Sequence, residues 1–159
     1  MVWCFHIRMI EGVSIKKIDV HTDERGFFAE MVKSGEGTFH EVLQTSYSET
    51  KPDVVKGFHI HDYWEVWCVV KGHAQVVLYD MRSDSPTKGE TQVVMTGEDN
   101  MMAIAIPGEV AHGYKSLGPG PMGIVYHASE AYNPKNVTIR SIPSDSPEIG
   151  FDWSTARTK

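Results

Sequence analysis

The 159-residue sequence is poor in cysteine, has no excess of basic residues and contains no long apolar run, and each absence excludes a class of protein. Its two cysteines, Cys4 and Cys68, are typical of free thiols in a reducing cytoplasm rather than of a disulfide framework. No stretch approaches the roughly 18 apolar residues of a membrane-spanning helix. The 15 basic residues against 21 acidic ones argue against a nucleic-acid-binding surface. We therefore expect a cytoplasmic protein with neither a membrane nor a nucleic acid as partner.

Helical periodicity is also nearly missing, and the sequence predicts only one short helix, over residues 37–43. Elsewhere, short apolar and β-branched runs alternate with glycine- and proline-containing turns at intervals of about 8–12 residues. The length and the 41% hydrophobic content suit a single globular domain over residues 1–159. Some eight to ten short strands predict an all-β sandwich or barrel, and a jelly-roll barrel fits best.

The densest group of chemically versatile side chains lies in residues 57–65, which run GFHIHDYWE. Side chains on a strand alternate between faces, so an unbroken strand would place His59, His61 and Glu65 on the same face. Two imidazoles and a carboxylate form a ligand set for Zn, Fe, Mn, Ni or Co, and His112 is a fourth candidate ligand. A polar pocket without a metal is the alternative interpretation of the same spacing.

The opposite face of this segment is almost entirely apolar. It consists of Phe58, Ile60, Asp62, Trp64, Val66, Cys68 and Val70. A strand that is polar toward a pocket and apolar on its outer face needs a second cover. We expect a second sheet or a partner subunit to supply that cover, which favours a homodimer.

Several short blocks follow one another in a distinctive order between residues 10 and 153. They are residues 23–28 (DERGFF) with Glu30, Gln44 with Ser46 and Ser48, 57–59, 80–82 with 85–87, 106–107 with 111–114, Tyr126, 132–134 and 152–153. Their order and spacing resemble the dTDP-4-dehydrorhamnose 3,5-epimerase family, whose members are cupin-type jelly rolls that act on a nucleotide sugar. The resemblance implies an all-β, cupin-type jelly-roll barrel, a small-molecule nucleotide sugar as partner and no organic cofactor.

The resemblance also implies roles for particular residues. His59 falls on the general base that removes the proton alpha to the 4-keto group, and Tyr126 falls on the acid that reprotonates the opposite face. The expected substrate-binding residues are Arg25, Phe28, Glu30, Gln44, Lys56 and Tyr132. The implied activity is epimerisation or isomerisation of a nucleotide-linked 4-keto-6-deoxy sugar, with or without the help of a metal.

Departures from the family pattern concentrate at this site. Glu65 stands where the family has a lysine over the enolate, and His61 stands where it has a glutamine. The carboxylate that partners the family's base follows the tryptophan at 153, and the sequence ends at Lys159 without it. The substitutions complete a pattern that resembles the cupin metal motifs, formed by His59, His61, Glu65 and His112.

These departures suggest that one divalent transition metal replaces the lysine as electrophile. A His59 bound to such a metal could not also act as the free base. Two other classes of function stay open on the sequence. One is a metal-dependent cupin of a different reaction class, such as a dioxygenase or a small-sugar isomerase. The other is a cupin that binds a sugar without catalysis.

Overall fold

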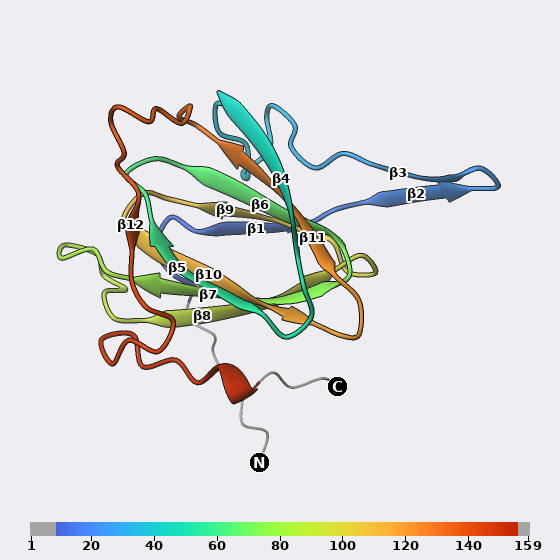
Figure 1. The fold of residues 1–159 in the computed structure, drawn as a ribbon. Helices are drawn as coiled ribbons and strands as arrows, with labels where there is room; N and C mark the ends of the chain where they lie inside the picture. The colour runs from blue at the N-terminus through green and yellow to red at the C-terminus, as the bar shows by residue number, and fades with distance from the viewer. Residues whose placement is uncertain (1–8, 156–159) are drawn as a thin grey trace, which may run out of the picture.

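The computed structural model describes residues 9–155, which form two facing antiparallel β-sheets (Figure 1). The first sheet has the order β1 (Ser14–Lys17), β9 (Met102–Ile106), β6 (Glu65–Lys71), β11 (Met122–Ala128) and β4 (Gln44–Thr50). The second has the order β12 (Arg140–Ser141), β5 (Val55–Ile60), β10 (Val110–Leu117), β7 (His73–Asp80) and β8 (Thr91–Gly97). The predicted all-β jelly-roll barrel is thus confirmed.

The main core fills the space between the two sheets, and β7 shows how the sequence builds it. Along this strand Val76 and Leu78 point into the core between the sheets, whereas Val77 belongs to a second cluster on the outer face. All three side chains are fully buried, each contributing about 1.5–3 kcal/mol relative to exposure. A strand that is covered on both faces therefore carries a continuous apolar run rather than an alternating one.

The apolar outer faces of β5 and β6 are covered by other segments of the same chain. Phe58 on β5 is fully buried and its ring lies 5.4 Å from that of Trp153, near the C-terminal end of the described chain. Cys68 on β6 is a free, buried thiol packed in a cluster with Met31 and Val32. Segments of the same chain, rather than a second sheet, therefore cover Phe58 and Cys68, and the homodimer stays a prediction.

Residues 57–65 do not form the unbroken strand that would place His59, His61 and Glu65 on the same face. β5 ends at Ile60, and β6 begins at Glu65 in the opposite sheet. The connecting residues 61–64 are held by a neighbouring loop: the Glu109 N–H donates to the His61 carbonyl at 2.7 Å. The chain crosses from one sheet to the other here, so the side chains on either side of the crossing face each other across the barrel.

Residues 37–43 do not form the predicted helix. The Phe39 N–H donates to the Glu36 carbonyl at 3.0 Å, which makes a turn, and the Leu43 N–H pairs with the Ala128 carbonyl of β11 at 2.9 Å. This sheet-type pairing leads directly into β4 and leaves no room for helical turns. Within residues 9–155, no helix is long and apolar enough to cross a membrane. Cys4 lies outside the described residues.

Candidate active site

A cavity of about 250 Å³ opens between the two sheets and collects half of the polar site residues singled out above. Its lining consists of Ser46, Lys56, His59, His61, Glu65, Trp67, Tyr114 and Tyr126. β4, β6 and β11 of the first sheet, β5 and β10 of the second and, for His61, the connection between β5 and β6 contribute these residues. The crossing between β5 and β6 explains how residues close in sequence come to line opposite walls.

The two expected catalytic residues, His59 and Tyr126, both line this cavity, one from each sheet. The hydroxyl of Tyr126 lies 2.6 Å from that of Ser48, and burial raises the pKa of Tyr126 far above its usual range. Burial and the nearby Lys56 ammonium lower the pKa of His59. A protonated phenol therefore faces a cavity shared with an unprotonated imidazole at neutral pH.

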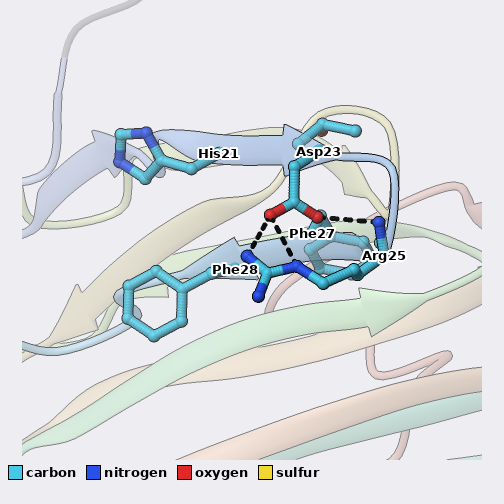
Figure 2. A pocket seen from close by; sticks show the side chains of 7 residues that line it. His21, Asp23, Arg25, Phe27 and Phe28 are labelled. Atoms are coloured by element: carbon cyan, nitrogen blue, oxygen red, sulfur yellow. Dashed lines mark hydrogen bonds and ion pairs between the residues drawn. The ribbon is translucent and has the colours of Figure 1, made fainter.

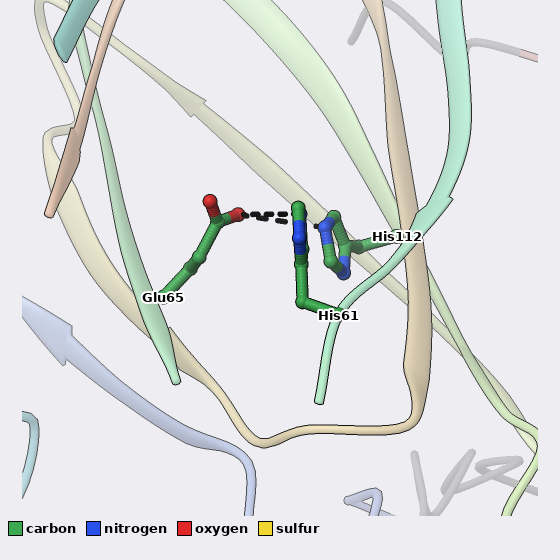
Figure 3. Close-up of side chains that lie close together, drawn as sticks. All are labelled: His61, Glu65 and His112. Carbon is green, nitrogen blue, oxygen red and sulfur yellow. Dashed lines mark ion pairs between the residues drawn. The ribbon is translucent and has the colours of Figure 1, made fainter. Parts of the chain in front are cut away.

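His61, Glu65 and His112 form a compact group in the wall of the cavity (Figure 3). The Glu65 Oε2 atom lies 3.4 Å from His61 Nε2 and 3.5 Å from His112 Nε2, and the two imidazole rings stack with their centroids 5.0 Å apart. All three residues are buried. His59 faces His112 across the β5–β10 strand pair but does not belong to this group. The structure therefore brings together three of the four expected metal ligands.

Hydrogen bonds from neighbouring groups orient these three side chains. The Val110 carbonyl lies 2.9 Å from His112 Nδ1, which places the ring proton on Nδ1 and leaves a lone pair on Nε2. The Trp67 indole N–H donates to Glu65 Oε2 at 2.8 Å. Burial raises the pKa of Glu65 to about 7 and lowers those of His61 and His112 to about 4 and about 3. Both imidazoles are therefore neutral at pH 7.

Two of the expected substrate-binding residues belong to this region. Lys56 lines the cavity itself. The side-chain amide of Gln44 lies beside it, donating to Ser46 Oγ at 3.2 Å and accepting from the Tyr132 N–H at 2.8 Å. The Tyr132 side chain is exposed and lines a separate, small hollow.

The other expected substrate-binding residues lie on or after a hairpin outside the barrel. β2 (Val20–Asp23) and β3 (Gly26–Ala29) pair only with each other and extend away from the two sheets (Figure 1). Arg25 pairs with Asp23 at the tip and lines a hollow along the hairpin together with Phe28 (Figure 2). Glu30, just after the hairpin, pairs with Lys33. Within a single chain, Arg25, Phe28 and Glu30 therefore lie outside the cavity that His59 lines.

The set of expected site residues omitted Ser46, Trp67 and Tyr114, all of which line the cavity. Alternation along the strands is the signal that could have identified them. Ser46 lies two residues from Ser48, Trp67 two residues from Glu65, and Tyr114 two residues from His112, so each shares a strand face with a group already under consideration.

Residues 8–159 match the sequence profile of the dTDP-4-dehydrorhamnose 3,5-epimerases. The spore coat polysaccharide biosynthesis protein SpsL of Bacillus subtilis (strain 168) is 49% identical over 148 residues, covering 92% of this chain and 98% of its own length. The probable low-salt glycan biosynthesis epimerase Agl13 of Haloferax volcanii is 32% identical, with 91% and 95% covered.

Solved structures give the same result. A dTDP sugar isomerase from Desulfovibrio desulfuricans G20 superposes with a TM-score of 0.85 at 27% identity, covering 93% of this chain and 94% of that one. The epimerase RmlC of Legionella pneumophila, in complex with dTDP-4-keto-L-rhamnose, superposes with a TM-score of 0.81 at 26% identity, covering 92% and 80%. The chain therefore belongs to the dTDP-4-dehydrorhamnose 3,5-epimerase family.

Proposed function

We propose that this protein epimerises a dTDP-linked 4-keto-6-deoxy sugar. The observation that carries the proposal is the position of His59 and Tyr126, which reach one cavity from opposite sheets. Inversion at a carbon beside a ketone requires removal of a proton from one face and delivery to the other, and a base and an acid on facing walls suit that reaction. A cavity of about 250 Å³ suits a sugar ring, leaving the nucleotide to lie outside it.

In the proposed reaction, His59 takes the proton from the carbon next to the ketone. The electron pair of the broken C–H bond moves toward the carbonyl oxygen and gives an enolate. Tyr126 then donates its phenolic proton to the opposite face of the carbon, and the carbonyl re-forms. Exchange with water restores both residues, so one proton leaves the sugar and one enters it. The ammonium group of Lys56, in the same cavity, stabilises the negative charge of the bound substrate.

A second copy of the chain completes the substrate site in this proposal. Phe27 and Phe28 on the β2–β3 hairpin are 62% and 63% exposed, and a two-stranded hairpin is only marginally stable in water. Because the two residues are adjacent on β3, each face of the hairpin exposes one aromatic ring that needs an apolar partner, whereas the cavity needs groups that bind a nucleotide. If the hairpin of one protomer lies over the cavity of the other, Arg25 and Phe28 reach the nucleotide part of the substrate.

The decisive experiment is hydrogen exchange on the substrate. The protein is incubated in D2O with a dTDP-4-keto-6-deoxyhexose, and deuterium on the carbons next to the ketone is followed by NMR and mass spectrometry. We expect incorporation by the native protein and a loss of about 100-fold or more in His59→Asn. His73→Asn is the matched control, because His73 lies on β7, pairs with Asp99 and does not line the cavity. The proposal fails if the native protein incorporates no deuterium.

A metal-dependent reaction of another class is the second candidate, and the group formed by His61, Glu65 and His112 favours it. Such an enzyme would turn over a substrate without a nucleotide and would not require His59 as a base. The exchange experiment separates the two functions, because only the epimerase incorporates solvent deuterium into the dTDP sugar in a manner that depends on His59.

A further inference from the structure

Two buried imidazole nitrogens lack the hydrogen bonds that buried groups normally make; His112 Nε2 faces Glu65, whereas the unpartnered atom of His61 is Nδ1, its Nε2 being the atom that faces Glu65. His112 Nε2 and His61 Nδ1 have no hydrogen-bond partner among residues 9–155, although the two side chains are only 2% and 6% exposed. A buried polar atom left without a partner costs about 1–3 kcal/mol. His112 Nε2 also points at a carboxylate oxygen without bonding to it. The position of His112 Nε2 therefore suits a further bound group in addition to the carboxylate.

The distances within the group match those between ligands of one metal ion. Glu65 Oε2 lies 3.4 Å from His61 Nε2 and 3.5 Å from His112 Nε2, which is longer than the roughly 2.7–3.2 Å of an N–H···O bond. Two ligand atoms that each lie about 2.1 Å from a tetrahedral ion are separated by about 3.4 Å. The three ligand atoms all lie within 4.8 Å of one another.

We propose that His61, Glu65 and His112 bind one divalent transition-metal ion, in a site that does not include His59. Two neutral imidazoles and one carboxylate offer three ligands with a combined charge of −1, a set suited to Zn²⁺, Fe²⁺, Mn²⁺, Co²⁺ or Ni²⁺. The His112 Nδ1–H bond to the Val110 carbonyl fixes the ring with Nε2 toward the ion. The Trp67 indole N–H donates to Glu65 Oε2, the same oxygen that faces both imidazoles, and so fixes the position of the carboxylate.

The position of the site gives the ion access to the substrate cavity. His61 and Glu65 line the cavity, whereas His112 is buried behind them, so an ion held by these three side chains would lie next to the cavity. A metal ion there would supply a Lewis acid beside the substrate oxygens. His59 lines the same cavity outside the group and keeps its imidazole free, so metal binding and proton abstraction use different residues.

Metal binding can be measured on the full chain without any substrate, so the result does not depend on the proposed epimerase activity. The protein is purified without added metal, analysed for its metal content, stripped with a chelator and titrated with Co²⁺ and then Zn²⁺. We expect one ion per chain, a visible Co²⁺ spectrum with nitrogen and oxygen ligands, and its loss on addition of Zn²⁺. The folded protein should also melt at a higher temperature with Zn²⁺ bound.

Two variants test the ligand assignment. Glu65→Gln keeps the shape of the side chain and an acceptor for Trp67, and His61→Ala removes a ligand at the cavity surface; we expect each to weaken Co²⁺ binding at least tenfold. His73→Ala, on the exposed surface, should bind as the native protein does, and circular dichroism verifies that all variants are folded. The proposal is overturned if the stripped protein gives no saturable Co²⁺ signal, or if Glu65→Gln and His61→Ala both bind with native affinity.

Discussion

Replacing Asp80 with asparagine is expected to destabilise the barrel by about 2–4 kcal/mol without touching the active site. The Asp80 carboxylate lies at the end of β7, is fully buried, and accepts hydrogen bonds from Arg82 Nε and Nη2, both at 2.8 Å, from Ser85 Oγ at 2.5 Å and from Thr87 Oγ1 at 2.6 Å. Arg82 and Thr87 in turn bond to the backbone of Glu11. One carboxylate therefore ties the loop after β7 to the N-terminal segment.

The magnitude follows from the loss of this charge. Asparagine keeps the shape of the aspartate side chain but replaces one acceptor oxygen with an NH2 group. That group cannot accept the hydrogen bonds that Arg82, Ser85 and Thr87 donate to Asp80. Leaving one partner of a buried ion pair alone costs about 3–5 kcal/mol, and the 23% exposure of the Arg82 side chain brings the expected value down to about 2–4 kcal/mol. For a chain of this length, that corresponds to a fall in Tm of roughly 4–16 °C.

The effect should depend on pH in a defined direction. Burial opposes ionisation of Asp80, but the hydrogen bonds from Arg82, Ser85 and Thr87 outweigh it and hold the pKa of the carboxyl well below its usual range. A depressed pKa stabilises the folded state fully above the unfolded-state pKa of about 3.9, and the stabilisation is lost as the pH falls toward the folded-state value. The native protein and Asp80→Asn should therefore differ most at neutral pH and converge in acid.

Thermal and urea unfolding followed by circular dichroism at pH 7 and in acid measure this difference. Asp84→Asn is the control, because Asp84 is exposed in the same loop and its replacement should change the stability by less than about 0.5 kcal/mol. If Asp80→Asn unfolds at the same temperature and urea concentration as the native protein at pH 7, the assignment of a stabilising role to this carboxylate is wrong.

Two further predictions concern the catalytic acid and the assembly. Tyr126→Phe should lower epimerisation by about 10²–10⁴-fold while deuterium exchange by His59 continues, because His59 can remove and return a proton on its own side of the sugar without the phenol. Tyr47→Phe, on the exposed surface, is the control. Equal loss of epimerisation and of deuterium exchange in Tyr126→Phe would contradict the assignment. Phe28→Asp should convert a dimer into monomers, as measured by size-exclusion chromatography with light scattering. Val137→Asp, which changes another exposed side chain, should leave the dimer intact. A native protein that is already monomeric would refute the dimer.

The fold was predictable because local sequence alone carries its signals. Turn residues between short apolar runs indicate strands, and strand alternation indicates two faces, neither of which depends on distant contacts. The errors lie where distant contacts decide. Leu43 pairs with β11 instead of continuing a helix, and the outer side chain Phe58 is covered by Trp153 from far along the chain. Neither contact leaves a trace in the neighbouring sequence.

The residue types of the active site were also evident from the sequence, because imidazoles and carboxylates are the side chains that bind metals and transfer protons near neutral pH. Their grouping was not. An unbroken strand would have put His59 with His61 and Glu65, but the chain changes sheets between residues 60 and 65. That crossing brings His61 and Glu65 together with His112, whereas His59, although paired with His112 across β5 and β10, lies outside this group of three.

The sequence by itself determined the class of fold, the family and the residues capable of chemistry, since these depend on composition, periodicity and the order of short motifs. Only the tertiary structure decided which of those residues share a wall of the cavity, which belong to an exposed hairpin and which stabilise a loop. The physical reason is that side-chain convergence depends on sheet order and on the points where the chain crosses between sheets. These are set by the packing of the whole barrel rather than by any local stretch of residues.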